Sequence, residues 1–116
     1  MIGHQQRVNI EPMSGALVVR LQVKQIEYPT MAQIERRLAA AHTTGRGTKV
    51  VVDLSQVEAI PSVMMGALVD MLNRLRDHGH RLVLCGLNDK VRGSFTVTRL
   101  DELFDIADTV EAGLAL

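Results

Sequence analysis

Apolar and polar residues alternate along residues 16–23, which read ALVVRLQV. Side chains of a strand point to opposite faces in turn, so this alternation predicts a strand with one packed face. Residues 7–10 are a second candidate strand, and Met13-Ser14-Gly15, between the two, has the composition of a short turn. Two strands joined by a short glycine-containing turn predict a β-hairpin at the start of the chain.

Two further segments, residues 50–54 and 81–87, are almost continuously apolar. Such runs are typical of strands that are covered on both faces. The segment between them has the spacing of an amphipathic helix that begins at Ser62 and ends at Gly79. Strand, helix and strand in that order predict a βαβ unit with parallel strands and a right-handed crossover.

Another helix is expected before the first of these apolar runs. Pro29-Thr30 opens it, and Thr30 with Gln33 has the spacing of a capping box, in which both side chains satisfy free backbone N–H groups. Gly45 is a candidate C-cap for the same helix.

The last part of the chain predicts three short elements. Asn88 is placed to cap a short helix from Asp89, residues 104–107 form a brief strand, and residues 109–116 form a final helix. The complete order is ββαβαβαβα. It predicts an α/β fold in a single domain over residues 1–116, with a mixed, mainly parallel sheet of about five strands covered by about four helices.

Composition narrows the classes of partner. The chain has 116 residues, enough for one domain with its own core. Its 13 basic and 13 acidic residues cancel, which argues against nucleic acid or an anionic membrane as partner, because both attract an excess of positive charge. No apolar run approaches the ~20 residues that cross a bilayer, so we expect a cytoplasmic protein without membrane insertion. Cys85, the single cysteine, lies in an apolar run, where core packing is expected.

The motifs that usually carry catalysis or cofactor binding are incomplete in this sequence. Residues 43–49 (TTGRGTK) resemble a phosphate-binding loop, but the order of residues differs and the segment precedes a strand. His78 and His80 lack the further ligands that zinc requires. Ser62 has no histidine or lysine close in sequence to act as a base. We therefore expect no enzyme activity, no cofactor and no metal.

Ser62 allows two interpretations. Pro61 would lie inside any helix that began at Ser55, so the helix is expected to start at Ser62. The serine is then either an N-cap, whose oxygen accepts a backbone N–H for about 1 kcal/mol, or a phosphoacceptor. The second interpretation rests on the free N–H groups and the dipole of a helix start, which stabilise a phosphate dianion.

The helix surface around Ser62 is more apolar than a purely solvated face, because it carries Val63, Ala67 and Val69. Gly66 lies on the same face as Ser62. A glycine inside a helix costs about 1 kcal/mol relative to alanine, which indicates the close approach of another segment. That segment is either a partner protein or a neighbouring helix of the same domain.

Three segments of the chain resemble the STAS domain, the fold of anti-sigma-factor antagonists and of the cytoplasmic tails of sulfate transporters. They are Asp53-Leu54-Ser55 at the end of an apolar strand, the stretch HRLVLCGLNDKVRGSF, and the ending TRLDELFDIADTVEAGLA. The resemblance covers nearly the whole chain and implies a partner-switch protein. In this family, the serine directly after Ile-Asp is phosphorylated by an ATP-using anti-sigma factor, and the unphosphorylated form binds that kinase. Ser62 occupies the matching position.

The residues around that serine depart from the family pattern. Pro61 stands where the family has aspartate, and Val63 where it has a second serine or threonine. Met64 replaces the first of two glycines, of which Gly66 is the second. We expect Met64 to add bulk where the backbone of a partner would approach.

The first hypothesis is therefore an anti-sigma-factor antagonist that binds a serine-kinase anti-sigma factor and is switched by phosphorylation of Ser62. The alternative is a STAS scaffold or ligand-sensing module without the switch, in a larger assembly or with a transporter; this alternative also allows a homo-oligomer. The residues assigned to partner binding are Asp53, Ser62, Val63, Gly66, Ala67, Val69, Asp70 and Asn73.

Overall fold

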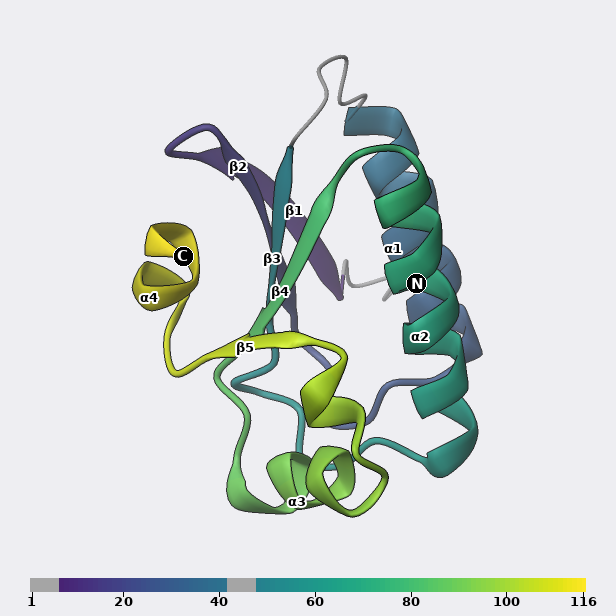
Figure 1. Ribbon diagram of the computed structural model, residues 1–116. Coiled ribbons are helices and arrows are strands. Elements are labelled where there is room, and N and C mark those ends of the chain that lie inside the picture. Colours follow the sequence, from purple (N-terminus) through teal and green to yellow (C-terminus); the bar gives the residue numbers. More distant parts are fainter. Residues whose placement is uncertain (1–6, 42–47) are drawn as a thin grey trace.

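A computed structural model describes residues 7–41 and 48–116 of the chain, and Figure 1 shows its architecture. In chain order the elements are β1 (Val8–Met13), β2 (Ala16–Leu21), α1 (Tyr28–Ala41), β3 (Lys49–Asp53), α2 (Ser62–Asp77), β4 (Arg81–Cys85), α3 (Asp89–Val97), the 3₁₀ turn η1 (Leu100–Glu102), β5 (Asp105–Ala107) and α4 (Val110–Ala115). This order confirms the predicted ββαβαβαβα arrangement. The sequence did not predict η1, which begins after Arg99, a residue with a left-handed φ of 61°.

The five strands form one sheet in the order β1-β2-β3-β4-β5. β1 and β2 are antiparallel and the other neighbours are parallel, so the sheet is mixed and mainly parallel, as predicted. Val19, Val52 and Leu84 lie side by side across the three central strands. All three side chains are fully buried in the larger hydrophobic cluster, on one face of the sheet.

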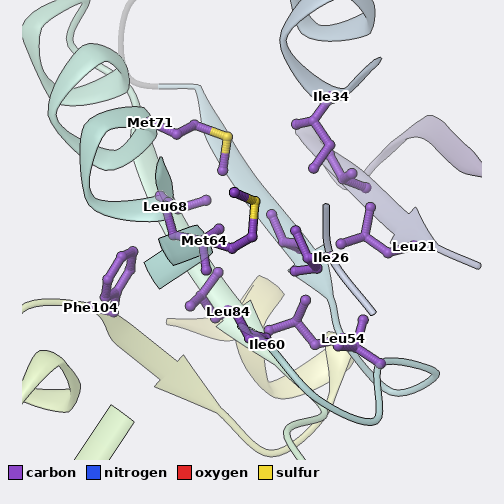
Figure 2. Close-up of a cluster of buried hydrophobic side chains, with 14 of the residues drawn as sticks. Leu21, Ile26, Ile34, Leu54, Ile60, Met64, Leu68, Met71, Leu84 and Phe104 are labelled. Atoms are coloured by element: carbon purple, nitrogen blue, oxygen red, sulfur yellow. The ribbon is translucent and has the colours of Figure 1, made fainter. Parts of the chain in front are cut away.

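The helices make two unequal layers. Figure 1 shows α1 and α2 on one side of the sheet, the short α4 on the other, and α3 beyond one end of the strands. The larger core lies beneath α1 and α2, where Met64, Leu68 and Met71 of α2 point toward side chains of the sheet (Figure 2). On the other face, α4 packs Val110 against the smaller cluster around Val51.

The bounds of all five strands differ by one to three residues from their predicted ranges, and the structure explains two of these differences. β1 continues to Met13, whereas residues 7–10 were expected, because its pairing with β2 runs without interruption to the turn. β4 ends at Cys85, before the predicted residue 87, because Gly86 has a φ of +74°. A side chain at position 86 would also lie 3.1 Å from the backbone nitrogen of Ser55, so this exit from the sheet favours glycine.

The predicted start of α2 at Ser62 is confirmed, whereas the caps predicted for α1 and α2 are wrong. α1 begins at Tyr28, so Thr30 lies inside the helix, and its hydroxyl accepts the backbone N–H of Glu27 at 3.3 Å. Thr30 therefore takes the third-residue role of a capping box and does not form one with Gln33. α2 begins with Ser62 as its first residue and Pro61 as its N-cap, with no capping bond from a side chain. The N-cap interpretation of Ser62 is therefore wrong.

The remaining helix ends agree with their predictions where they can be compared. The side chain of Asn88 caps α3, accepting the backbone N–H of Val91 at 2.7 Å. Thr109 caps α4 in the same way, with the N–H of Ala112 at 3.0 Å. Gly45, the expected C-cap of α1, lies outside the described residues, as do residues 43–47 of the TTGRGTK segment. Across residues 7–41 and 48–116, we find no helix with the length and apolar character needed to traverse a bilayer.

Candidate docking site at the start of α2

The carboxyl ends of β2, β3 and β4 share one edge of the sheet, because these strands are parallel neighbours. The three connections that leave this edge are held to one another by hydrogen bonds. The carbonyl oxygen of Lys24 accepts the backbone N–H of Glu58 at 2.7 Å, and Asn88 Nδ2 donates to the carbonyl oxygen of Val57 at 3.2 Å. The start of α2 is therefore fixed by the connections on both sides, at the edge where open α/β sheets usually bind ligands.

Ser62 is exposed at this edge, as the first residue of α2. The first turn of α2 contains no acidic residue, and no side chain caps it. The positive end of the helix dipole is therefore not offset by a carboxylate in that turn. A phosphate on Ser62 would lie where backbone N–H groups and the dipole favour negative charge.

An exposed stripe runs from Ser62 along α2 through Gly66, Asp70 and Asn73. The spacing of these residues places them on one face of the helix. A methyl group added at Gly66 would meet no atom of the described residues within 4 Å. Packing of a neighbouring helix against Gly66, one of the two explanations for this glycine, is therefore not observed in the described part of the chain. Val63 lies beside the stripe and its surface is 58% exposed.

Three other residues of α2 contribute to the core. Ala67 and Val69, both assigned to partner binding, are only partly buried but pack against the larger hydrophobic cluster. Met64 is 1% exposed and lies among core side chains in Figure 2. The expectation that Met64 adds bulk toward a partner is therefore wrong, because its side chain points away from the exposed stripe.

Asp53, the remaining residue assigned to partner binding, lies apart from the exposed stripe. Its neighbour in β4 is Cys85, a member of the hydrophobic cluster beneath α4, so both side chains lie on the α4 face of the sheet. Asp53 Oδ2 lies 3.0 Å from Arg20 Nη1, and Oδ1 accepts the backbone N–H of Ser55 at 3.0 Å. Both oxygens are thus engaged within the chain.

A hollow of about 420 Å³ separates the start of α2 from α3. Ser62 and Met65 line it from α2, whereas Lys90 and Val97 line it from α3. Val97 is 84% exposed, more than any other large apolar side chain in the described part of the chain. The α3 side of the hollow was not assigned to partner binding from the sequence. The exposure of Val97 could have been predicted from the sequence, because Val97 falls outside the apolar stripe formed by Val91 and Phe95.

The cysteine and the histidine that the sequence singled out make contacts within the chain. Cys85 is fully buried, and its thiol donates to the carbonyl oxygen of Val52 at 3.4 Å. Burial, together with the charge of Asp53, raises the pKa of this thiol to about 12, so the prediction that Cys85 is a core residue is confirmed. His78 Nδ1 lies 2.8 Å from the carbonyl oxygen of Arg74 at the end of α2. Within the described ranges, no group of three or more His, Cys, Asp or Glu side chains could hold a metal ion.

Comparison with known proteins gives consistent results. The model of the STAS domain family matches residues 7–113. The protein named "Putative anti-sigma factor antagonist BtrV", of Bordetella bronchiseptica, is 28% identical over 109 residues, which cover 94% of this chain and 92% of that protein.

Two solved structures show the same fold. An anti-sigma-factor antagonist (STAS) domain protein of Planctomyces limnophilus has a TM-score of 0.79 and 21% identity, with 93% of this chain and 95% of that chain covered. The anti-sigma factor antagonist SpoIIAA in its unphosphorylated form has a TM-score of 0.67 and 20% identity, with 90% of this chain and 91% of that chain covered.

Proposed function

Because the chain belongs to the STAS domain family, we propose that it is an anti-sigma factor antagonist that binds a serine-kinase anti-sigma factor and is released when Ser62 is phosphorylated. The observation that carries this proposal is the exposure of Ser62 at the start of α2, beside a stripe that no described part of the chain covers. The function is one of binding, and the catalytic groups of the phosphorylation step belong to the partner.

The first part of the proposal is docking along α2. Ser62, Gly66, Asp70 and Asn73 form an exposed stripe, and Val63 adds apolar area beside it. The absence of a side chain at Gly66 lets a partner backbone approach the helix closely. Ala67 and Val69 support this surface from the core side, and Asp53 acts indirectly by holding the turn that follows β3.

The second part is the phosphorylation of Ser62. Ser62 Oγ attacks the γ-phosphorus of ATP held by the partner, and the bond from that phosphorus to the β,γ-bridging oxygen breaks, releasing ADP. A base of the partner accepts the hydroxyl proton. The product carries close to two negative charges at neutral pH in the middle of the docking surface, which opposes renewed binding.

The test uses the cognate serine-kinase anti-sigma factor. We expect incubation with that kinase and ATP to add one phosphate to the wild-type chain, detected by intact mass, and none to Ser62→Ala. Phosphate on another residue would move the site. A complete lack of phosphate with a kinase that still binds would overturn the switch and favour the scaffold alternative, for which native mass spectrometry would show a stable oligomer or bound molecule.

Charge substitution tests the docking surface separately. Ser62→Asp is expected to weaken binding to the anti-sigma factor by about tenfold or more, because it places an unpaired charge in the interface. Ser14→Asp is the matched control. Ser14 is an exposed serine in the turn between β1 and β2, and its left-handed φ of 53° suits aspartate. Equal affinities for wild type and Ser62→Asp would contradict docking at this surface.

The proposed partner also implies a compartment. An ATP-using kinase that controls a sigma factor acts in the cytoplasm, so we propose that this chain acts there. Fractionation of cells that express the tagged chain, with the sigma factor followed in the same fractions, tests this assignment.

A further inference from the structure

The hollow between α2 and α3 carries a single charge. Of the residues that line it, Lys90 is the only one with an ionisable side chain, and the rest are apolar, hydroxyl-bearing or glycine. Ser62 contributes to the same lining from α2. The residue proposed as the phosphoacceptor therefore lines the same open space as one lysine, and the lining contains no acidic residue.

Lys90 has no acidic partner among the described residues, because none of the ion pairs found there includes it. It is the second residue of α3, in the helix turn where the dipole disfavours a positive charge. Asp89 precedes it but does not line the hollow. An anion entering the hollow would therefore be attracted by a charge that the fold leaves uncompensated.

The hydroxyl groups of the hollow are weaker candidates for this role. Ser94 Oγ donates to the carbonyl oxygen of Lys90 at 3.2 Å, and Thr98 Oγ1 donates to that of Ser94 at 2.8 Å. Each hydroxyl has one hydrogen, so neither has a second to offer to a phosphate. Lys90 is the side chain of the lining that can donate to it.

We propose that Lys90 is the residue that binds the phosphate on Ser62, by an ion pair across the hollow. This inference rests on the proposed function, since it names the residue of this chain that binds the phosphate added to Ser62. The pair would join the start of α2 to α3 and draw the lysine stem over the hollow that Val97 borders. A partner that had used Val63 and Val97 would meet a bridged, charged surface in place of an open apolar one.

The experiment installs phosphoserine at position 62 during synthesis, so that no kinase is needed. Phosphorus NMR then measures the second pKa of the phosphate, ordinarily near 6. A neighbouring ammonium group favours the dianion and lowers this pKa. We expect Lys90→Met to raise the phosphate pKa by about half a unit, a modest shift for an exposed pair, and Lys90→Arg to retain most of the wild-type value.

Lys24→Met is the control, since Lys24 is exposed and does not line the hollow. We expect no change in the phosphate pKa for this variant. An unchanged pKa in Lys90→Met, or an equal shift in Lys24→Met, would overturn the assignment of Lys90. Circular dichroism of the variants establishes that they fold, and Lys90→Gln, which also removes the charge and is expected to raise the phosphate pKa, takes the place of Lys90→Met if that variant does not fold. An unchanged phosphate pKa in Lys90→Met would contradict the ion pair but not the modification of Ser62 by the kinase. A lack of modification by the kinase would contradict the proposed function, and the ion pair could still be measured with the installed phosphoserine.

Discussion

Arg20 of β2 and Asp53 of β3 form an ion pair, with Nη1 3.0 Å from Oδ2, on the same face of the sheet as α4. Arg20 also donates from Nε to Glu11 Oε1 at 3.1 Å. The hydrogen bond to Glu11 and the charge of Asp53 both raise the pKa of Arg20. These contacts join β1, β2 and β3 side by side, so Asp53 stabilises the sheet and the turn after β3.

Asp53→Asn should accordingly affect stability more than binding. The amide oxygen can still accept the N–H of Ser55, but the attraction to Arg20 is lost, and we expect about 1 kcal/mol less free energy of unfolding in urea titrations. Affinity for the anti-sigma factor, measured by calorimetry, should stay close to that of the wild type. A large loss of affinity with unchanged stability would contradict this prediction and indicate that Asp53 contacts the partner directly. Arg20→Met should cost less in the Asp53→Asn background than in the wild type, because the pair with Asp53 is already broken and only the contact with Glu11 remains to be lost.

Ser62→Ala should leave stability almost unchanged. No side chain caps α2, so removing the hydroxyl should change the free energy of unfolding by less than about 0.5 kcal/mol. Thr109→Ala is the comparison, because Thr109 Oγ1 does accept a helix N–H, and its loss should cost about 1 kcal/mol. Equal losses in the two variants would show that the Ser62 hydroxyl has a capping role after all.

Two helical glycines should respond to alanine with opposite signs. At Gly66 an added methyl group has open space, so we expect the free energy of unfolding to rise by up to about 1 kcal/mol. At Gly113 it would lie 3.2 Å from Val51 Cγ1 and 3.4 Å from Val83 Cγ1, so we expect α4 to be displaced at a loss of about 1–3 kcal/mol. Thermal and urea unfolding of both variants measure the difference.

Gly66→Ala also tests the docking surface. If a partner backbone approaches Gly66, the variant should bind the anti-sigma factor more weakly although it is more stable. Gly15, whose φ is +80°, is unsuitable as a control because a side chain there would be strained. Ala32→Ser on the exposed surface of α1 is a suitable one, since it adds an atom outside the stripe. A Gly66→Ala variant with undiminished affinity would remove the reason for a glycine at this position.

The buried thiol of Cys85 should make stability depend on pH in alkaline solution. Its pKa is raised from the ordinary 9.0 to about 12 in the folded chain. Below pH 9 both states hold the proton and stability is unaffected. Between pH 9 and 12 the unfolded chain releases a proton that the folded chain keeps, so the free energy of unfolding falls as pH rises, by at most about 1.4 kcal/mol per pH unit.

The measurement is the difference between wild type and Cys85→Ala in urea titrations across this pH range, which cancels the titration of other groups. Parallel slopes in the two proteins would contradict the raised pKa. A thiol reagent should likewise react with the wild type at pH 8 only after unfolding.

Most of the architecture was predictable because it follows from patterns within single segments. The apolar runs that became β3 and β4, with an amphipathic helix between them, leave few topologies, since parallel strands need a right-handed crossover. Helix starts were less certain. Threonine and serine satisfy backbone N–H groups from more than one position, and the sequence alone did not distinguish Thr30 inside α1 from Thr30 ahead of it.

The candidate site was predictable only in the part that α2 supplies. Ser62 and Gly66 were found from helical spacing and from the cost of an internal glycine. Met64 was misjudged because the apolar face of α2 is wide enough to include two consecutive methionines, Met64 and Met65. The contribution of α3 escaped prediction, because the separation of Lys90 from Ser62 in space depends on how α3 packs, which no local pattern encodes.

The burial of Met64 just after Ser62 has a mechanical consequence. The helix turn that presents the hydroxyl is anchored in the core, so the backbone there has little freedom to shift when charge is added. Phosphorylation at this position would act by changing the electrostatic potential of the surface, and the backbone would keep its conformation. Crystal structures of the two chemical states should then have the same backbone at the start of α2, and the differences there should be confined to side chains, that of Lys90 among them.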